Sequence, residues 1–158
     1  MTPELKDIDA VIGEYDGLAR KALDYTRMMK AMVDAAKEPG FSIESWGPLS
    51  EMVAIEDFVR VGNFKEVMTW PDYIGFLTEW AKTSDWEGSF KRVTESGNLV
   101  FLELEERSRV GAFTSVVNSV SVYAFDDAGK IAHLDIYLQM PMPSAEMLKS
   151  YEGIEISG

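Results

Sequence analysis

One short stretch near the C-terminal end carries three side chains that commonly transfer protons. His133, Asp135 and Tyr137 occupy every second position of the segment AHLDIYLQ, and His133 is the only histidine in the chain. Imidazole, carboxylate and phenol groups are frequent general acids and bases in enzymes. Alternation with apolar residues, however, is typical of a β-strand, in which successive side chains point to opposite faces. The three residues therefore share one face of a predicted strand.

The other face of this strand is the better candidate for the lining of a cavity. Leu134 and Ile136 lie on it, and burial favours apolar side chains because an unpaired buried polar group costs free energy. We therefore predict that Leu134 and Ile136 bind substrate. For His133 a structural or interface role is favoured over a catalytic one.

A second alternating segment, LVFLELEERSRV, places a carboxylate on an apolar face. Leu102 and Leu104 share one face of the predicted strand, and the same face continues to Glu106. A carboxylate in an apolar interior must find a partner or hold a proton, and both states are useful for acid–base chemistry. Glu106 is thus a candidate catalytic residue and Leu104 a candidate substrate contact. The alternative is a β-bulge near Glu105 and Glu106 that turns the carboxylate to solvent.

The elements that would position these residues follow an α+β order within one domain, residues 1–158. Helical spacing of apolar residues runs from Thr2 to about Lys37, with a possible break at Gly13 or Gly17. An ordered loop at 41–49 carries Trp46. The predicted elements after it are a strand (50–59), its hairpin partner (63–68), a helix (69–83) and an antiparallel meander from residue 90.

Composition excludes several classes of function. The 158 residues include no cysteine and one histidine, so disulfides, thiolate metal sites and histidine-rich metal sites are excluded. The net charge of −12 argues against nucleic-acid binding. No apolar run has the length of a membrane span, and the N-terminal residues do not form a secretion signal. We expect a cytoplasmic protein without membrane partner, metal or cofactor.

Three passages resemble the NTF2-like superfamily, which includes ketosteroid isomerase and SnoaL-type polyketide cyclases. They are VAIEDF at 53–58, PDYIGFLTEW at 71–80 and VYAFDDAGKIAHLDIYL at 122–138. The resemblance implies a cone-shaped α+β fold, in which a curved antiparallel sheet wraps around the N-terminal and middle helices. It also implies homo-oligomers that associate through the outer face of the sheet.

The resemblance further implies site residues. Asp57 ends the predicted strand on the same parity as Val53 and Ile55, which would place it beside apolar residues. By the resemblance it also takes the position of the general base of ketosteroid isomerases, with a solvated hairpin aspartate as the alternative. Tyr123 would face the pocket and donate a hydrogen bond to a developing oxyanion, unless it is only a core tyrosine. Ser121 takes the position of that family's oxyanion-hole acid. Because a serine hydroxyl is a weaker donor than a protonated carboxyl group, steroid isomerisation itself is not expected.

The remaining predicted substrate contacts are aromatic. A tyrosine on the first helix, Tyr25 or Tyr15, would correspond to the helix-borne tyrosine of ketosteroid isomerase. The resemblance makes the helix at 71–80 a lid over the pocket. We predict an aromatic wall formed by Tyr25, Trp46, Phe76 and Trp80.

These residues favour a cofactor-independent lyase, isomerase or dehydratase that acts on a hydrophobic aromatic or polycyclic molecule. The superfamily also includes lyases that cleave a C–C bond of lignin-derived diarylpropanes, and the aromatic and methionine content here suits such a substrate. The alternative is a non-catalytic module for small-molecule binding or dimerisation. In that case Asp57 and Glu106 would be exposed, or paired without a cavity.

Overall fold

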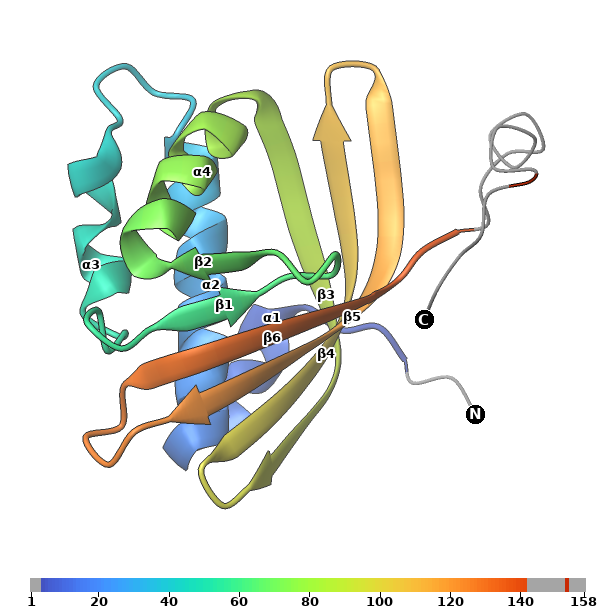
Figure 1. The fold of residues 1–158 in the computed structure, drawn as a ribbon. Helices are drawn as coiled ribbons and strands as arrows, with labels where there is room; N and C mark the ends of the chain where they lie inside the picture. The colour runs from blue at the N-terminus through green and yellow to red at the C-terminus, as the bar shows by residue number, and fades with distance from the viewer. Residues whose placement is uncertain (1–3, 142–152, 154–158) are drawn as a thin grey trace.

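A computed structural model describes residues 4–141 and residue 153. Helices and 3₁₀ turns gather on one side of a curved, open sheet (Figure 1). The strand order is β2-β1-β6-β5-β4-β3. The helical elements are α1 (Ile8–Val11), η1 (Ile12–Glu14), α2 (Gly17–Ala35), η2 (Ile43–Trp46), α3 (Gly47–Ser50) and α4 (Trp70–Thr83). The strands are β1 (Val59–Val61), β2 (Val67–Thr69), β3 (Ser84–Ser96), β4 (Leu99–Val110), β5 (Phe113–Phe125) and β6 (Ile131–Gln139).

The predicted α+β cone is confirmed, with one difference in strand direction. Strands β3 to β6 form an antiparallel meander, whereas β1 pairs with β6 in parallel. In that parallel pair Arg60 lies opposite Leu134. The sheet is therefore mixed at its β2–β1 edge, and Arg60 takes the same face as the apolar residues of β6.

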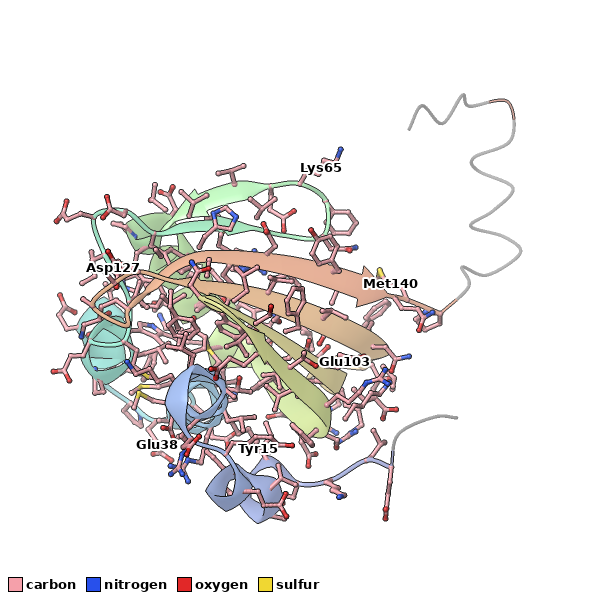
Figure 2. All side chains as sticks on the ribbon, turned by 90° about the horizontal axis from the view of Figure 1, so that it is seen from below. Tyr15, Glu38, Lys65, Glu103, Asp127 and Met140 are labelled. Atoms are coloured by element: carbon pink, nitrogen blue, oxygen red, sulfur yellow. The ribbon has the colours of Figure 1, made fainter. Side chains whose placement is uncertain are left out.

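The first predicted helix is interrupted at Gly17. The chain passes through η1, and α2 then starts at Gly17, whose φ of +60° lies in the left-handed region that favours glycine. Leu23, Met29 and Val33 lie on the buried face of α2. The predicted start at Thr2 lies outside the described residues; the first described helix begins at Ile8. Figure 2 looks along α2 and shows side chains filling the space between it and the sheet.

The predicted middle helix is confirmed as α4. The Thr69 hydroxyl accepts a hydrogen bond from the backbone N–H of Asp72, and the Asp72 carboxylate accepts one from the N–H of Thr69. This capping box satisfies N–H groups that the first turn would otherwise leave unpaired. Tyr73 and Leu77, four residues apart, lie on the buried face of the helix. The cap thus fixes where α4 begins, and the apolar residues at helical spacing determine which side faces the core.

The predicted strand at 50–59 is wrong. Residues 51–52 and 55–57 form turns, and Val53 makes only an isolated parallel bridge to Ile131. The N–H groups of Asp57 and Phe58 both donate to the carbonyl of Ala54. Strand β1 begins only at Val59. Phe58 is 2% exposed in the core, while Asp57 is exposed. The alternating pattern therefore reflects a turn that buries one aromatic ring, and the strand parity assumed for Asp57 does not apply.

Strands β4 and β5 pair without interruption from Leu99 opposite Ala124 to Val110 opposite Phe113. The β-bulge considered near Glu105 and Glu106 is absent from this ladder, and a register shift occurs instead in β3, between Phe90 and Arg92. The face that carries Leu104 therefore continues to Glu106.

Candidate functional site

A cavity of about 190 Å³ lies between α2, α4 and the inner face of the sheet. Its polar lining consists of Tyr25, Thr26, Arg60, Tyr73, Trp86, Glu106, Ser121 and Tyr123. Its apolar lining consists of Met29, Leu104, Leu134, Ile136 and Leu138. An apolar wall with a few convergent polar groups is typical of a small-molecule site.

Three larger hollows lie on the surface, with volumes of about 530, 380 and 310 Å³. Their walls carry many charged side chains, and most of these neutralise one another in exposed pairs. In the largest hollow Lys30 pairs with Asp34 at 2.8 Å, and Arg109 pairs with Asp85 at 3.0 Å. We therefore place the candidate site in the smaller, interior cavity.

Glu106 is the only carboxylate among the described residues that line this cavity. It is partly buried, and the indole Nε1–H of Trp86 donates a hydrogen bond of 2.8 Å to its Oε1. That bond satisfies one carboxylate oxygen on the protein side. The described residues provide Oε2 with no hydrogen-bond donor, so this oxygen is the one available to a ligand.

Arg60 contributes the one cation of the cavity lining. Its guanidinium carbon lies 4.7 Å from the centroid of the Tyr73 ring, and its Nη1 lies 3.5 Å from Oε1 of Glu66. The side chain is 15% exposed, and its Nε is buried with no hydrogen-bond partner among the described residues. A buried donor of this kind normally has an acceptor. A ligand in the cavity could supply it.

Gly62 allows Glu66 to reach Arg60. A Cβ atom at residue 62 would lie 1.5 Å from Oε1 of Glu66 and 2.9 Å from Nη1 of Arg60. The loop between β1 and β2 therefore folds the Glu66 carboxylate into the space that a larger residue at 62 would occupy. This packing, together with the Tyr73 ring, fixes the guanidinium at the cavity wall.

Three buried tyrosines complete the polar lining. The hydroxyl oxygen of Tyr123 lies 3.4 Å from Oγ1 of Thr26, whereas the hydroxyl of Tyr25 has no partner among the described residues. Burial raises the pKa of Tyr25, Tyr73 and Tyr123 above the ordinary value of about 10. All three therefore remain neutral phenols near pH 7 and can donate hydrogen bonds to a ligand oxygen.

Most of the predicted site residues come together in the cavity. They come from four elements: α2, β4, β5 and β6. They are Tyr25, Leu104, Glu106, Ser121, Tyr123, Leu134 and Ile136. The shared location makes a common role possible, while the individual catalytic and binding roles stay predictions.

Four predicted site residues lie elsewhere. Asp57 is exposed in a turn. Trp46 is fully buried in the core, where its indole N–H donates to Oγ1 of Thr78 at 2.9 Å. Phe76 is 51% exposed because α4 turns Tyr73 and Leu77 toward the sheet, and Trp80 packs at the edge of the core. These four side chains do not line the cavity.

Sequence reasoning missed four polar residues of the lining: Thr26, Arg60, Tyr73 and Trp86. Tyr73 sits one helical turn before Leu77, which was a usable signal for the buried face of α4. Trp86 has the same strand parity as Phe90, and only the start of β3 at Ser84 reveals it. Arg60 stands between two valines, and its orientation follows from the parallel pairing with β6.

His133, Asp135 and Tyr137 lie on the face of β6 opposite the cavity-lining residues. Nε2 of His133 lies 2.9 Å from Oδ1 of Asp135, and Tyr137 is 59% exposed. His133, Asp135 and Tyr137 are therefore absent from the cavity lining. Self-association through this outer face stays a prediction.

Residues 4–141 and 153 contain no metal-binding cluster and no membrane-spanning helix. No three histidine, aspartate or glutamate side chains in this part of the chain form a group that could hold a metal ion. Within the same residues, no helix has the length and apolar character needed to cross a membrane.

The fold is similar to several solved structures, although no protein-family model and no curated protein sequence matches the chain. A SnoaL-like polyketide-cyclase-type protein from Jannaschia aligns over 87% of this chain and 94% of its own, with a TM-score of 0.57 and 10% identity. An NTF2-like protein of unknown function from Pseudomonas aeruginosa aligns over 75% and 98%, with a TM-score of 0.56 and 17% identity. An epoxide hydrolase of the LEH-like type from M. tuberculosis aligns over 73% and 82%, with a TM-score of 0.55 and 16% identity. These similarities, together with the helices packed in an open, curved sheet, show that the chain has the NTF2-like fold.

Proposed function

We propose that this protein is a cofactor-independent acid–base enzyme that acts on a small hydrophobic molecule, with Glu106 as the base. One observation carries the proposal. A carboxylate and a guanidinium group, Glu106 and Arg60, face the same small cavity among apolar walls and neutral phenols. Paired groups of this kind can take up a proton at one end and stabilise negative charge at the other.

The charges of the cavity fit proton abstraction from a neutral substrate. When Glu106 accepts a proton from a C–H or O–H group, the negative charge leaves the carboxylate and develops on the substrate. The buried Nε–H of Arg60 and the hydroxyl of Tyr25 have no partner among the described residues. They can donate to the substrate oxygen on which that charge develops. Isomerisation, dehydration and ring closure all begin with such a step.

The cavity volume limits the size of the substrate. An engineered protein cavity of about 150 Å³ holds benzene, so the 190 Å³ present here suits one ring with a small substituent. A polycyclic substrate would have to extend beyond the cavity. Cleavage of a lignin-derived diarylpropane would likewise require that one of its two rings stay outside. Single-ring hydroxyl and carbonyl compounds are therefore the first substrates to test.

The experiment is turnover of a panel of such compounds by the wild type and by Glu106→Gln. Loss of general-base catalysis lowers the rate by about 10²- to 10⁴-fold. Glu103→Gln is the matched control, because Glu103 lies on the same strand but faces outward and pairs with Arg92 at 2.7 Å. Turnover that is unchanged in Glu106→Gln would exclude Glu106 as the base.

A second candidate function is a binding module without catalysis. The unpartnered donors of Tyr25 and Arg60 favour any ligand that presents an acceptor oxygen, whether or not it reacts. This candidate is supported if the wild type binds a panel compound, as measured by calorimetry, and the compound is recovered unchanged.

A further inference from the structure

Trp86 occupies the junction between the interior cavity and two of the surface hollows. Of the described residues, it alone lines all three: the 190 Å³ cavity, the 310 Å³ hollow beside the N-terminal segment and the 530 Å³ hollow. Thr26 also lines both the cavity and the 310 Å³ hollow. The indole therefore stands between the space assigned to the ligand and further space of similar or larger size.

The conformation of this indole is fixed from two sides. In the β3–β4 register Gly88 lies opposite Glu106, and Trp86 lies two residues away on the same face. A Cβ atom at Gly88 would lie 3.4 Å from Cζ2 of Trp86 and 3.2 Å from Cδ1 of Leu104. The indole thus lies over the glycine, which gives it room, and reaches Glu106 with a 2.8 Å hydrogen bond.

We propose that Trp86 determines which substrates enter the site: it restricts the cavity to single-ring compounds and positions the Glu106 carboxylate. Size selection needs only the indole ring, which closes the cavity toward the 310 Å³ hollow. Positioning needs only the Nε1–H donor. The second role rests on the proposed function of Glu106, whereas the first concerns binding alone.

Two substitutions separate the roles. Trp86→Leu removes the ring that divides the cavity from the hollow, and it also removes the donor. Trp86→Phe keeps a six-membered ring in that place and removes only the N–H group. Near-ultraviolet circular dichroism checks that each variant folds.

Binding measured by calorimetry tests size selection with two phenols. 4-Methylphenol has one ring, and 4-phenylphenol has two. We expect the wild type and Trp86→Phe to prefer the one-ring ligand by at least about tenfold, since overpacking of a filled site is strongly disfavoured. Trp86→Leu should lose that preference. Equal binding of both phenols by the wild type, or an unchanged preference in Trp86→Leu, would overturn the proposal.

Kinetics and fluorine NMR test the positioning role. With a turned-over substrate, Trp86→Phe should lower kcat by about tenfold, the worth of one hydrogen bond, and leave KM unchanged. In protein labelled with 5-fluorotryptophan, the resonance missing from Trp86→Phe should move in Glu106→Gln. A resonance that does not shift in Glu106→Gln, or a kcat that is unchanged in Trp86→Phe, would refute the positioning role. If Glu106→Gln retains full turnover, the proposed function is refuted. The size-selection role of Trp86 is still tested independently by the binding of the two phenols.

Discussion

The Arg60 guanidinium carbon lies 4.7 Å from the centroid of the Tyr73 ring, on the wall of the same cavity that Glu106 lines. A cation above the face of an aromatic ring is attracted to its π-electrons, and the attraction strengthens as water is removed. Burial raises the pKa of Tyr73, an effect that the nearby Arg60 charge partly offsets. Tyr73 therefore stays neutral near pH 7 and holds the guanidinium without cancelling its charge.

Arg60→Met should lower kcat by about 10²-fold, the typical cost of losing one donor to a developing oxyanion. Arg60→Lys should restore only part of the rate, because an ammonium group cannot reproduce the planar guanidinium over Tyr73. Arg92→Met serves as the control, since Arg92 is exposed on the outer face. Steady-state kinetics with a substrate from the panel measures the effect. A kcat within twofold of the wild type in Arg60→Met would place Arg60 outside the reaction.

Strand alternation was sufficient to place Glu106 and Leu134, because each lies in a long strand with one apolar face. The β4–β5 ladder runs without a register shift through Glu106, so the parity counted from Leu102 still holds there. In β6 the residues opposite Ser119, Ser121 and Tyr123 are all apolar. A one-residue slip would turn every one of them outward, and burial of the apolar face prevents it.

The same reasoning failed for Asp57 because local hydrogen bonds interrupt the apparent strand. The turn after Ala54 changes the parity, and Phe58 rather than Asp57 contributes to the interior. Arg60 could not be predicted for a related reason. Its position depends on three backbone pairs between β1 and a strand more than 70 residues later, and residue spacing alone does not reveal such pairing.

The buried phenols predict a loss of stability at alkaline pH. Burial raises the pKa of Tyr25 above its unfolded value of about 10, so the folded state holds a proton that the unfolded state releases. The resulting contribution to stability is fully present below about pH 10 and is lost as the pH rises toward the folded-state pKa. The free energy of unfolding, measured with urea, should therefore decline between about pH 9 and 11. Tyr25→Phe should make that decline shallower. An equally steep decline in Tyr25→Phe would show that ionisation of Tyr25 does not cause the loss of stability.

Trp46 should matter for stability and not for ligand binding. Its indole N–H donates to Oγ1 of Thr78 inside the core, away from the cavity. Thr78→Val leaves that buried donor unpaired, which typically costs about 1–3 kcal/mol in the free energy of unfolding. Thr78→Ser keeps the hydroxyl group and serves as the control. Equal unfolding free energies for the two variants, or a weakened affinity for 4-methylphenol in Thr78→Val, would return Trp46 to the list of possible ligand contacts.

The outer face of the sheet should mediate self-association. Tyr137 is 59% exposed and lies opposite Val120 on β5, and Val116 on the same face is 49% exposed. Exposed apolar side chains on one face of a sheet favour contact with another protein surface. Light scattering should give a mass of twice the 17.7 kDa chain for the wild type and the mass of one chain for Tyr137→Glu. Phe113→Ser, at the β4–β5 tip, should leave the mass unchanged. A monomeric wild type would refute the prediction, whereas a monomeric Tyr137→Glu that still binds 4-methylphenol would show that the cavity functions without the partner.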